Sequence, residues 1–199
     1  MAVAEAPTST TDSARQRILD VTAALVLEHG VAGVAQRQIA ERVGIKAASL
    51  YHHFASKNEI VEAVFRRGID VMERAWDEAA ASGPADDHER LATHVRAHLS
   101  ALFENGPYTA AHVTAFRTAP AEVREAVVPM RDAYEARWTA LLTELDLPTP
   151  VGLSRLTLFG AMNTAVEWFD TDRGNLDELA DIITTQFRGR PANHREDTT

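Results

Sequence analysis

Residues 36–57 read QRQIAERVGIKAASLYHHFASK, and the interpretation of the whole chain depends on this stretch. Its first half carries apolar residues at the spacing of one helix face, namely Ile39, Ala40 and Val43. Gly44 follows at a place where a helix end favours a residue that adopts positive φ. The pattern predicts a helix up to Val43, a tight turn in which Ile45 is buried, and a second helix from about Lys46 to His52.

The second helix offers few side chains that a protein core would use. Leu50 and Phe54 are four residues apart and are expected to pack inward. The outward positions of the pattern are Lys46, Ala47, Ser49, Tyr51, His52 and His53. Small residues beside a cation and several hydrogen-bonding groups suit a surface that lies close to a DNA groove and binds phosphates. The stretch therefore predicts a DNA-binding surface.

This stretch resembles the helix-turn-helix of the TetR (tetracycline repressor) family of bacterial transcriptional regulators. The resemblance covers about residues 13–62, and its motifs are Ile18-Leu19-Asp20, Glu28-His29-Gly30, Ile39-Ala40, Val43-Gly44-Ile45, Ser49–Phe54 and Ser56–Glu59. The chain departs from the family at Ala35, where a Ser or Thr usually caps the next helix. It departs again at Lys46, where the family often has Ser. These departures concern the operator contacts rather than the fold.

The resemblance implies an all-α fold with two domains. An N-terminal three-helix, helix-turn-helix DNA-binding domain is expected over residues 12–57. A larger helical domain for ligand binding and dimerisation is expected over residues 58–188. Residues 1–11 and 189–199 are expected to be a disordered arm and a disordered tail. By resemblance, the protein is a cytoplasmic repressor that binds a near-palindromic operator as a homodimer and leaves it when a small molecule binds.

Specific DNA contacts follow from side-chain chemistry. Phosphate contacts are expected from Tyr51, His52 and Lys57. Residues expected near base edges are Gln36, Arg37, Lys46, Ala47 and Ser49, and the surface is completed by Ala48 and His53. Arg37 suits guanine, Gln36 suits adenine, and Ala47 or Ala48 suits a thymine methyl group. Ser56 and Glu59 form a capping box, which places Lys57 at a helix N-terminus, where a phosphate would be favourable. The alternative for Lys57 is an exposed side chain with no partner.

Composition narrows the class of protein. The 199 residues carry a net charge of −9, but residues 1–57 have a net charge of +1 and residues 58–199 of −10, so a local basic patch is compatible with the total. The sequence has no cysteine, which excludes disulfides and thiolate metal sites. It has no apolar run of about 18 residues, so no membrane span is expected. The polar N-terminus does not have the pattern of a signal peptide.

Helical periodicity continues along the chain. A first helix is expected over residues 12–29, ended by Gly30, and later helices are expected at about 57–82, 86–105, 108–116, 120–146, 151–170 and 175–188. Residues 120–146 carry a single apolar stripe of Val123, Val127, Met130, Tyr134, Trp138, Leu141 and Leu145. Pro129 is expected to kink or interrupt that helix. The stripe is either core or the wall of a pocket that opens at the kink.

A ligand cavity is predicted in the second domain. Its expected wall is His98, Phe103, Phe116, Met130, Tyr134, Trp138, Met162, Asn163 and Trp168. This mixture suits a mostly apolar effector with a few polar points. Arg96, Arg117, Arg131 and Arg155 leave an acyl-CoA possible. His94 and His98 lie four apart and either line the cavity or pack; a metal site would need a third ligand, and none is adjacent.

The last two helices are expected to form a subunit interface. Apolar residues surround nearly the whole of residues 151–170, which predicts burial on more than one side. TetR-like proteins pair such helices in a dimeric four-helix bundle. Two other classes of protein remain open, namely a DNA-binding repressor or architectural protein without a ligand, and an all-helical enzyme. The sequence has no GxSxG, HExxH, P-loop or Gly-rich dinucleotide turn, so no catalytic residue, metal or cofactor is predicted.

Overall fold

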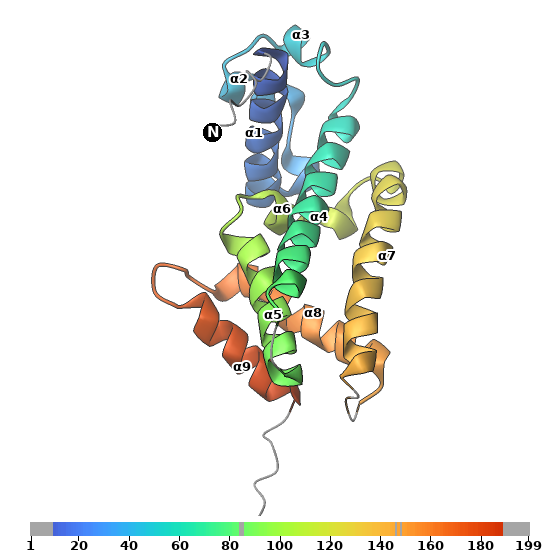
Figure 1. The fold of residues 1–199 in the computed structure, drawn as a ribbon. Helices are drawn as coiled ribbons and strands as arrows, with labels where there is room; N and C mark the ends of the chain where they lie inside the picture. Colours follow the sequence, from blue (N-terminus) through green and yellow to red (C-terminus); the bar gives the residue numbers. More distant parts are fainter. Residues whose placement is uncertain (1–9, 84–85, 146, 148, 189–199) are drawn as a thin grey trace, which may run out of the picture. The chain divides into compact units, whose positions relative to one another are not determined.

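The computed structural model describes residues 10–83, 86–145, 147 and 149–188, and all the regular elements of this part of the chain are helices (Figure 1). The predicted all-α class is confirmed. The chain divides into two compact units: Met1–Val71 with Glu104–Asp132, and Met72–Phe103 with Ala133–Thr199. Helices α4 (Lys57–Ala81) and α7 (Ala121–Glu144) each contribute to both units. The functional boundary expected after residue 57 stays a prediction.

The first unit is built around α1 (Thr10–Gly33), which packs against α2 (Gln36–Val43) and α6 (Tyr108–Ala115). It also contains α3 (Ala47–Leu50) and the short 3₁₀ helix η1 (Phe116–Thr118). Helical geometry in α1 stops at Gly30, with φ 69° and ψ 167°, as the sequence predicted. The start at residue 12 was wrong, because α1 begins at Thr10. The predicted arm and tail otherwise fall outside the described residues.

Helices α4 and α6 approach each other closely at Gly68. A Cβ atom added to Gly68 would lie 2.7 Å from the carbonyl oxygen of Tyr108 and 3.1 Å from the Cβ of His112. The hydroxyl of Thr109 donates a hydrogen bond of 3.1 Å to the carbonyl of Gly68 at the same crossing. Glycine is therefore required here by space, because any side chain would push the two backbones apart.

The second unit contains α5 (Asp87–Phe103), α8 (Val151–Trp168) and α9 (Leu176–Arg188), together with the last turns of α4 and α7. Its core is aromatic. The ring of Trp76 lies 5.0 Å from that of Trp138 and 6.0 Å from that of Tyr134. Asn175 caps α9, as predicted, because its Oδ1 accepts a 2.7 Å hydrogen bond from the backbone N–H of Asp177.

Pro129 was predicted to kink or interrupt the helix; it does not interrupt it, because α7 continues through this residue, and a kink stays a prediction. A proline removes the hydrogen bond to the carbonyl four residues earlier, which here belongs to Glu125. Both residues are exposed, so water can satisfy that carbonyl without a break in the helix. The apolar stripe of α7 is buried apart from Met130, which is half-buried.

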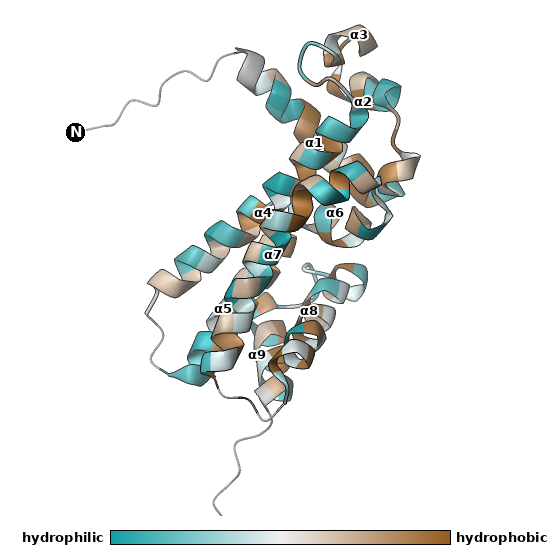
Figure 2. Cartoon of the chain, turned by 90° about the vertical axis from the view of Figure 1, so that its right-hand side faces the viewer, coloured by the Kyte–Doolittle hydropathy of each residue, from teal (hydrophilic) through white to brown (hydrophobic). Residues whose placement is uncertain are grey.

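Helix α8 is only partly buried within the single chain. One stripe is buried, namely Ser154, Leu158, Met162 and Ala165. Other apolar side chains of α8 are open to solvent in the single chain, with exposed fractions of 62% for Leu153 and 61% for both Leu156 and Trp168. Figure 2 shows the hydrophobic residues distributed along α8. The chain itself therefore covers one side of this helix, and the predicted burial of a further side in a subunit interface stays a prediction.

Candidate functional site

The α2–turn–α3 segment of the first unit has the geometry that its sequence predicted. Gly44 adopts a left-handed conformation, with φ 79° and ψ 32°, and its backbone N–H donates to the carbonyls of Ala40 and Glu41. Helix α2 buries Ile39 and Ala40. Residue Ala35 provides no side-chain cap, as predicted. The tight αL turn thus reverses the chain immediately before α3.

The second helix of the motif is shorter than predicted. Helix α3 covers Ala47–Leu50, and residues 51–53 form turns in which the N–H groups of His53 and Phe54 both donate to the carbonyl of Leu50 at 2.9 Å. Leu50 and Phe54 are buried, as predicted, and they anchor both ends of this turn. Ile45 was predicted to be buried and is only half-buried. Its position between two short helices leaves one side of it open.

Most of the predicted DNA-contacting side chains lie on the surface of this unit. Those that are exposed are Arg37, Lys46, Ala47, Ala48, Tyr51 and His52, and those that are half-buried are Gln36, Ser49, His53 and Lys57. Tyr51 is 59% exposed, and its hydroxyl donates a 3.0 Å hydrogen bond to Oε1 of Gln36. Arg37 pairs with Glu41 at 2.8 Å on the surface of α2. The Tyr51–Gln36 bond orients two predicted contact residues relative to each other.

Lys57 has partners that the sequence did not indicate. Its Nζ donates to the carbonyls of Val31 and Val34 at 3.1 and 3.0 Å, so it ties α4 to the end of α1. The backbone N–H of Glu59 donates to Oγ of Ser56 at 3.1 Å, which is one half of the predicted capping box. The Glu59 carboxylate accepts from the N–H of Ala55. A phosphate contact of Lys57 stays a prediction.

Arg15 positions the turn that follows α3, a role that no local sequence pattern indicates. Its guanidinium donates to the carbonyl of His53 and lies 3.9 Å from the centre of the Phe54 ring. The partners are 38 and 39 residues away in sequence, so helical periodicity does not indicate them. Beside it, Tyr108 of α6 donates to the carboxylate of Asp20 on α1. Helix α1 thereby links α6 to the turn that carries Tyr51.

A second cluster brings together three of the residues predicted to line a cavity. Nε2 of His98 lies 2.9 Å from Oδ1 of Asn163, and its Nδ1 lies 3.0 Å from the hydroxyl of Tyr134. The amide oxygen only accepts, so Nε2 carries the proton and Nδ1 accepts from Tyr134. Burial lowers the pKa of His98 to about 4 and raises the pKa of Tyr134. Both groups are therefore neutral near pH 7.

The other predicted cavity residues are divided between the two units. Trp138 and Met162 are fully buried in the second unit, and Trp138 contacts His98 ring to ring at 6.1 Å. Phe103 packs against Phe169 at 5.6 Å, and Trp168 packs against the same ring at 5.9 Å. Phe116 and Met130 belong to the first unit. There Phe116 lies 5.3 Å from the ring of His112, and Met130 accepts a hydrogen bond from Arg66.

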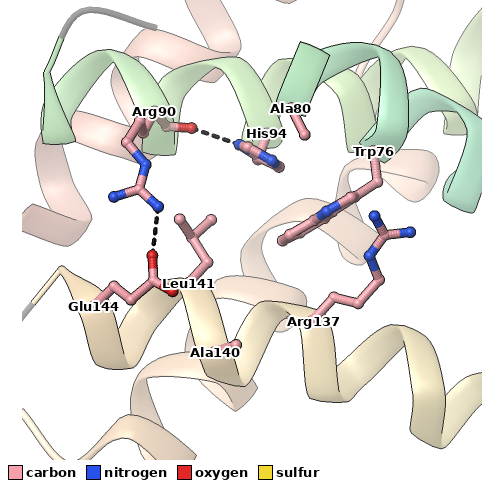
Figure 3. Close-up of a pocket in the computed structure, with 8 residues that line it drawn as sticks. All are labelled: Trp76, Ala80, Arg90, His94, Arg137, Ala140, Leu141 and Glu144. Atoms are coloured by element: carbon pink, nitrogen blue, oxygen red, sulfur yellow. Dashed lines mark hydrogen bonds and ion pairs between the residues drawn. The ribbon is translucent and has the colours of Figure 1, made fainter. Parts of the chain in front are cut away.

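A groove of about 340 Å³ lies in the second unit between α4, α5 and α7 (Figure 3). Its lining consists of Trp76, Ala80, Arg90, His94, Arg137, Ala140, Leu141 and Glu144. Arg90 pairs with Glu144 at 2.6 Å, and Arg137 pairs with Asp77 while its guanidinium lies 5.2 Å from the Trp76 ring centre. This groove was not predicted from the sequence, which indicated only His94 and Leu141 among these residues. The other lining residues are separated along three helices, so no local motif indicates them.

His94 occupies the wall of this groove. Its Nδ1 lies 2.8 Å from the carbonyl of Arg90, which only accepts, so Nδ1 is the protonated nitrogen and Nε2 is an acceptor. Burial lowers the pKa of His94, and the charges of Arg90 and Arg137 act in the same direction. Among the described residues, no group of three or more His, Asp or Glu side chains is arranged to hold a metal ion. None of the described helices is long and apolar enough to cross a membrane.

Comparisons with known proteins agree with this geometry. The family model of bacterial regulatory proteins of the tetR family matches residues 18–64, and that of the tetracyclin repressor-like C-terminal domain matches residues 84–189. The second match alone covers more than half of the chain. The chain belongs to the TetR family. Its predicted all-α fold and its predicted membership of this family of bacterial regulatory proteins are thus confirmed.

Relatives and solved structures extend the comparison. The transcriptional repressor KstR2 of Rhodococcus jostii is 38% identical over 76 residues, which cover 38% of this chain and 37% of that repressor. The chain thus spans about a third of the length of the curated relatives that it first matches. The TetR-family regulator PfmR of Thermus thermophilus has a TM-score of 0.74 at 25% identity over 86% of this chain and 97% of that one. AibR in complex with isovaleryl coenzyme A and operator DNA has a TM-score of 0.79 at 19% identity over 88% and 98%.

Proposed function

We propose that this TetR-family member is a transcriptional repressor that binds a near-palindromic operator as a homodimer and is released by a small effector bound in its second unit. The observation that carries the proposal is the α2–turn–α3 surface, where a left-handed Gly44 and the buried Leu50 and Phe54 present Tyr51, His52 and Lys46 to solvent. These side chains match the chemistry of phosphate and base-edge contacts. The transcriptional repressor KstR2 of Rhodococcus jostii is 38% identical over 76 residues, which supports repression.

The exposed apolar side of α8 supports the homodimer. Leu153, Leu156 and Trp168 on α8, with Ile182 on α9, are all more than half exposed in one chain. A groove of about 430 Å³ between α8 and α9 continues this surface. Soluble proteins seldom leave such apolar surface open, and a two-fold interface covers it with the same surface of a second copy. A dimer also places two recognition segments about 34–36 Å apart, which one turn of DNA requires.

The effector proposal rests on the second unit. The His98–Tyr134–Asn163 cluster and the groove beside Trp76 combine apolar walls with a few polar groups, as small-molecule sites do. AibR was solved with isovaleryl coenzyme A, which makes that compound the first effector to test. Release of the operator when isovaleryl coenzyme A is added to the protein–operator complex would support an acyl-CoA effector. Unchanged anisotropy of a labelled operator would exclude this compound as the effector.

The DNA-binding function is tested by selection of duplexes from random DNA with the purified protein. We expect an inverted repeat to be enriched, with half-sites about one helical turn apart. Binding to it should weaken steeply as salt rises, because phosphate contacts release counterions. A selection that enriches no sequence would contradict the proposed function.

Tyr51→Phe is expected to weaken binding to the selected operator about fivefold, which corresponds to the loss of one hydrogen bond of about 1 kcal/mol. The change removes the hydroxyl that bonds Gln36 and is available to a phosphate. Because tyrosine is uncharged, the slope of log K against log salt should stay as it is. Fluorescence anisotropy over a salt series measures both quantities. His88→Ala, at an exposed position of α5, is the control, and an unaltered affinity of Tyr51→Phe would remove Tyr51 from the interface.

Leu156→Glu is expected to convert the dimer to a monomer at micromolar concentration. The substitution places a charge within the exposed apolar surface of α8, and burying an unpaired charge in an interface costs several kcal/mol. Sedimentation equilibrium measures the mass of the particle. Val128→Glu, at a partly exposed apolar position of α7, is the matched control and should leave the mass unchanged. A dimer that survives Leu156→Glu would exclude this surface as the interface.

A further inference from the structure

We propose that the groove between α4, α5 and α7 binds an amphipathic organic anion, with its anionic group on Arg137 and its apolar body along Trp76, Ala140 and Leu141. This inference rests on the proposed effector function and specifies the chemistry of the effector. It commits to a compound with one carboxylate, sulfonate or phosphate at the end of an apolar or aromatic body.

The charge of the groove differs from that of the unit around it. The second unit contains nine Arg and seventeen Asp or Glu residues, a net charge of −8, counted over Met72–Phe103 and Ala133–Thr199. The groove lining nevertheless contains two arginines, Arg90 and Arg137, and one acid, Glu144. A cationic site in an acidic surface attracts anions locally, and the guanidinium suits planar anionic groups.

The two ends of the groove are not equivalent, and Figure 3 shows them. At one end Glu144 itself lines the groove and holds Arg90, so its carboxylate repels an incoming anion. Asp87 also binds Arg90 at this end, at 3.4 Å. His94 lies between the two ends, with its Nδ1 on the Arg90 carbonyl and its ring centre 4.2 Å from that of Trp76, and its acceptor nitrogen offers an anion no hydrogen bond. An anion is therefore not favoured at the Arg90 end.

Positive charge lines the groove at the Arg137 end. The acid that pairs with Arg137 is Asp77, which is not part of the groove lining. A guanidinium has five N–H donors, so an ion pair with one carboxylate leaves donors for a second anion. The Trp76 ring beside it provides a flat apolar surface, and the adjoining Ala80, Ala140 and Leu141 are apolar as well. An apolar body on this surface with its anion at Arg137 satisfies both parts of the groove.

The test uses a matched pair of fluorescent probes and the full chain without DNA. The two probes are 1-anilinonaphthalene-8-sulfonate and N-phenyl-1-naphthylamine. They share one aromatic skeleton, and only the first has a sulfonate group and hence a negative charge. We expect the sulfonate probe to bind about tenfold more tightly, and Arg137→Gln to lower its affinity about tenfold while the affinity for the neutral probe changes less than twofold. Arg137→Lys should retain most of the sulfonate affinity, since it retains the charge. Glu144→Gln should raise that affinity two- to threefold.

The matched control is Arg173→Gln, which removes one exposed positive charge outside the groove. An equal loss of sulfonate binding in Arg137→Gln and Arg173→Gln would overturn the proposal, because only net charge would then matter. An equal loss for both probes in Arg137→Gln and Arg137→Lys would also overturn it, since the residue would then act by packing. Equal affinity of the two probes for the unmodified protein would likewise overturn the proposal, because the groove would then not favour an anion. DNA is absent throughout, so a failure here is distinct from a failure of the operator selection.

Discussion

Lowering the pH from 7 to 5 is expected to reduce the free energy of unfolding by about 4 kcal/mol, because two buried histidines contribute roughly 2 kcal/mol each over this interval. His98 is 1% exposed and His112 is 3% exposed. Burial lowers the pKa of His98 to about 4 and that of His112 to about 3, and the charge of Arg131 adds to the shift of His112. The folded protein therefore holds both rings neutral.

The sign of this pH effect on the free energy of unfolding depends on which state, folded or unfolded, binds the protons. In the unfolded chain both rings have a pKa of about 6.5 and take up protons as the pH falls below that value. The folded protein does not take them up until the pH approaches 4 for His98 and 3 for His112. The stability that these residues contribute is thus fully present above pH 6.5 and is lost progressively below it. Urea unfolding at a series of pH values, at one protein concentration, measures this loss.

Single variants separate the two histidines. His112→Leu keeps an apolar side chain between the Phe65 and Phe116 rings, and His98→Gln keeps a hydrogen-bonding side chain beside Tyr134 and Asn163. Each variant, compared with its own value at pH 7, is expected to lose roughly 2 kcal/mol of the pH dependence. The buried His94, whose pKa is also lowered, adds to the acid sensitivity in both variants. His88→Gln, at an exposed position, is the control and should retain all of it. A full pH dependence in both core variants would show that other groups cause the acid sensitivity.

The α2–turn–α3 segment illustrates how far the sequence determines local structure. The turn at Gly44 and the inward positions of Leu50 and Phe54 depend on backbone conformation and short-range spacing, and both were predictable. The length of α3 was not predictable. The helix ends after four residues, and the chain continues in a turn whose hydrogen bonds go to the Leu50 carbonyl. Arg15 and Lys57 show the same limit. Their partners lie 23 to 39 residues away, so only the fold brings them together.

The second unit shows why the candidate effector site was only partly predictable. His98, Tyr134 and Asn163 were selected for their chemistry, and the fold joins them in one hydrogen-bonded cluster. Phe103 and Trp168 were selected on the same grounds, but they pack against Phe169 instead. The arginines of the groove are not predictable from the sequence, because each is isolated in sequence and its neighbours belong to another helix. Side-chain type indicates what a residue can bind, whereas its neighbours depend on how helices cross.

Gly68→Ala is expected to lower the free energy of unfolding by about 2 to 3 kcal/mol, the usual cost of forcing atoms into a packed helix crossing. The new Cβ would lie 2.7 Å from the carbonyl oxygen of Tyr108 and 3.0 Å from its carbonyl carbon. These are backbone atoms, so relief requires movement of α6 rather than rotation of a side chain. The higher helix propensity of alanine, up to about 1 kcal/mol, offsets only part of the cost. Thermal or urea unfolding measures the change.

A matched control separates the crossing from the general effect of replacing glycine in a helix. Gly152 lies in α8 with no atom within 4 Å of an added Cβ, so Gly152→Ala should be neutral or stabilise by up to about 1 kcal/mol. Equal effects of the two substitutions would contradict the crowded crossing. Gly68→Ala should also weaken operator binding by the folded protein. Displacing α6 strains the Tyr108–Asp20 hydrogen bond to α1, and α1 holds the turn after α3 through Arg15. Unchanged operator affinity in a destabilised Gly68→Ala protein would show that this crossing supports the fold without positioning the DNA-binding surface.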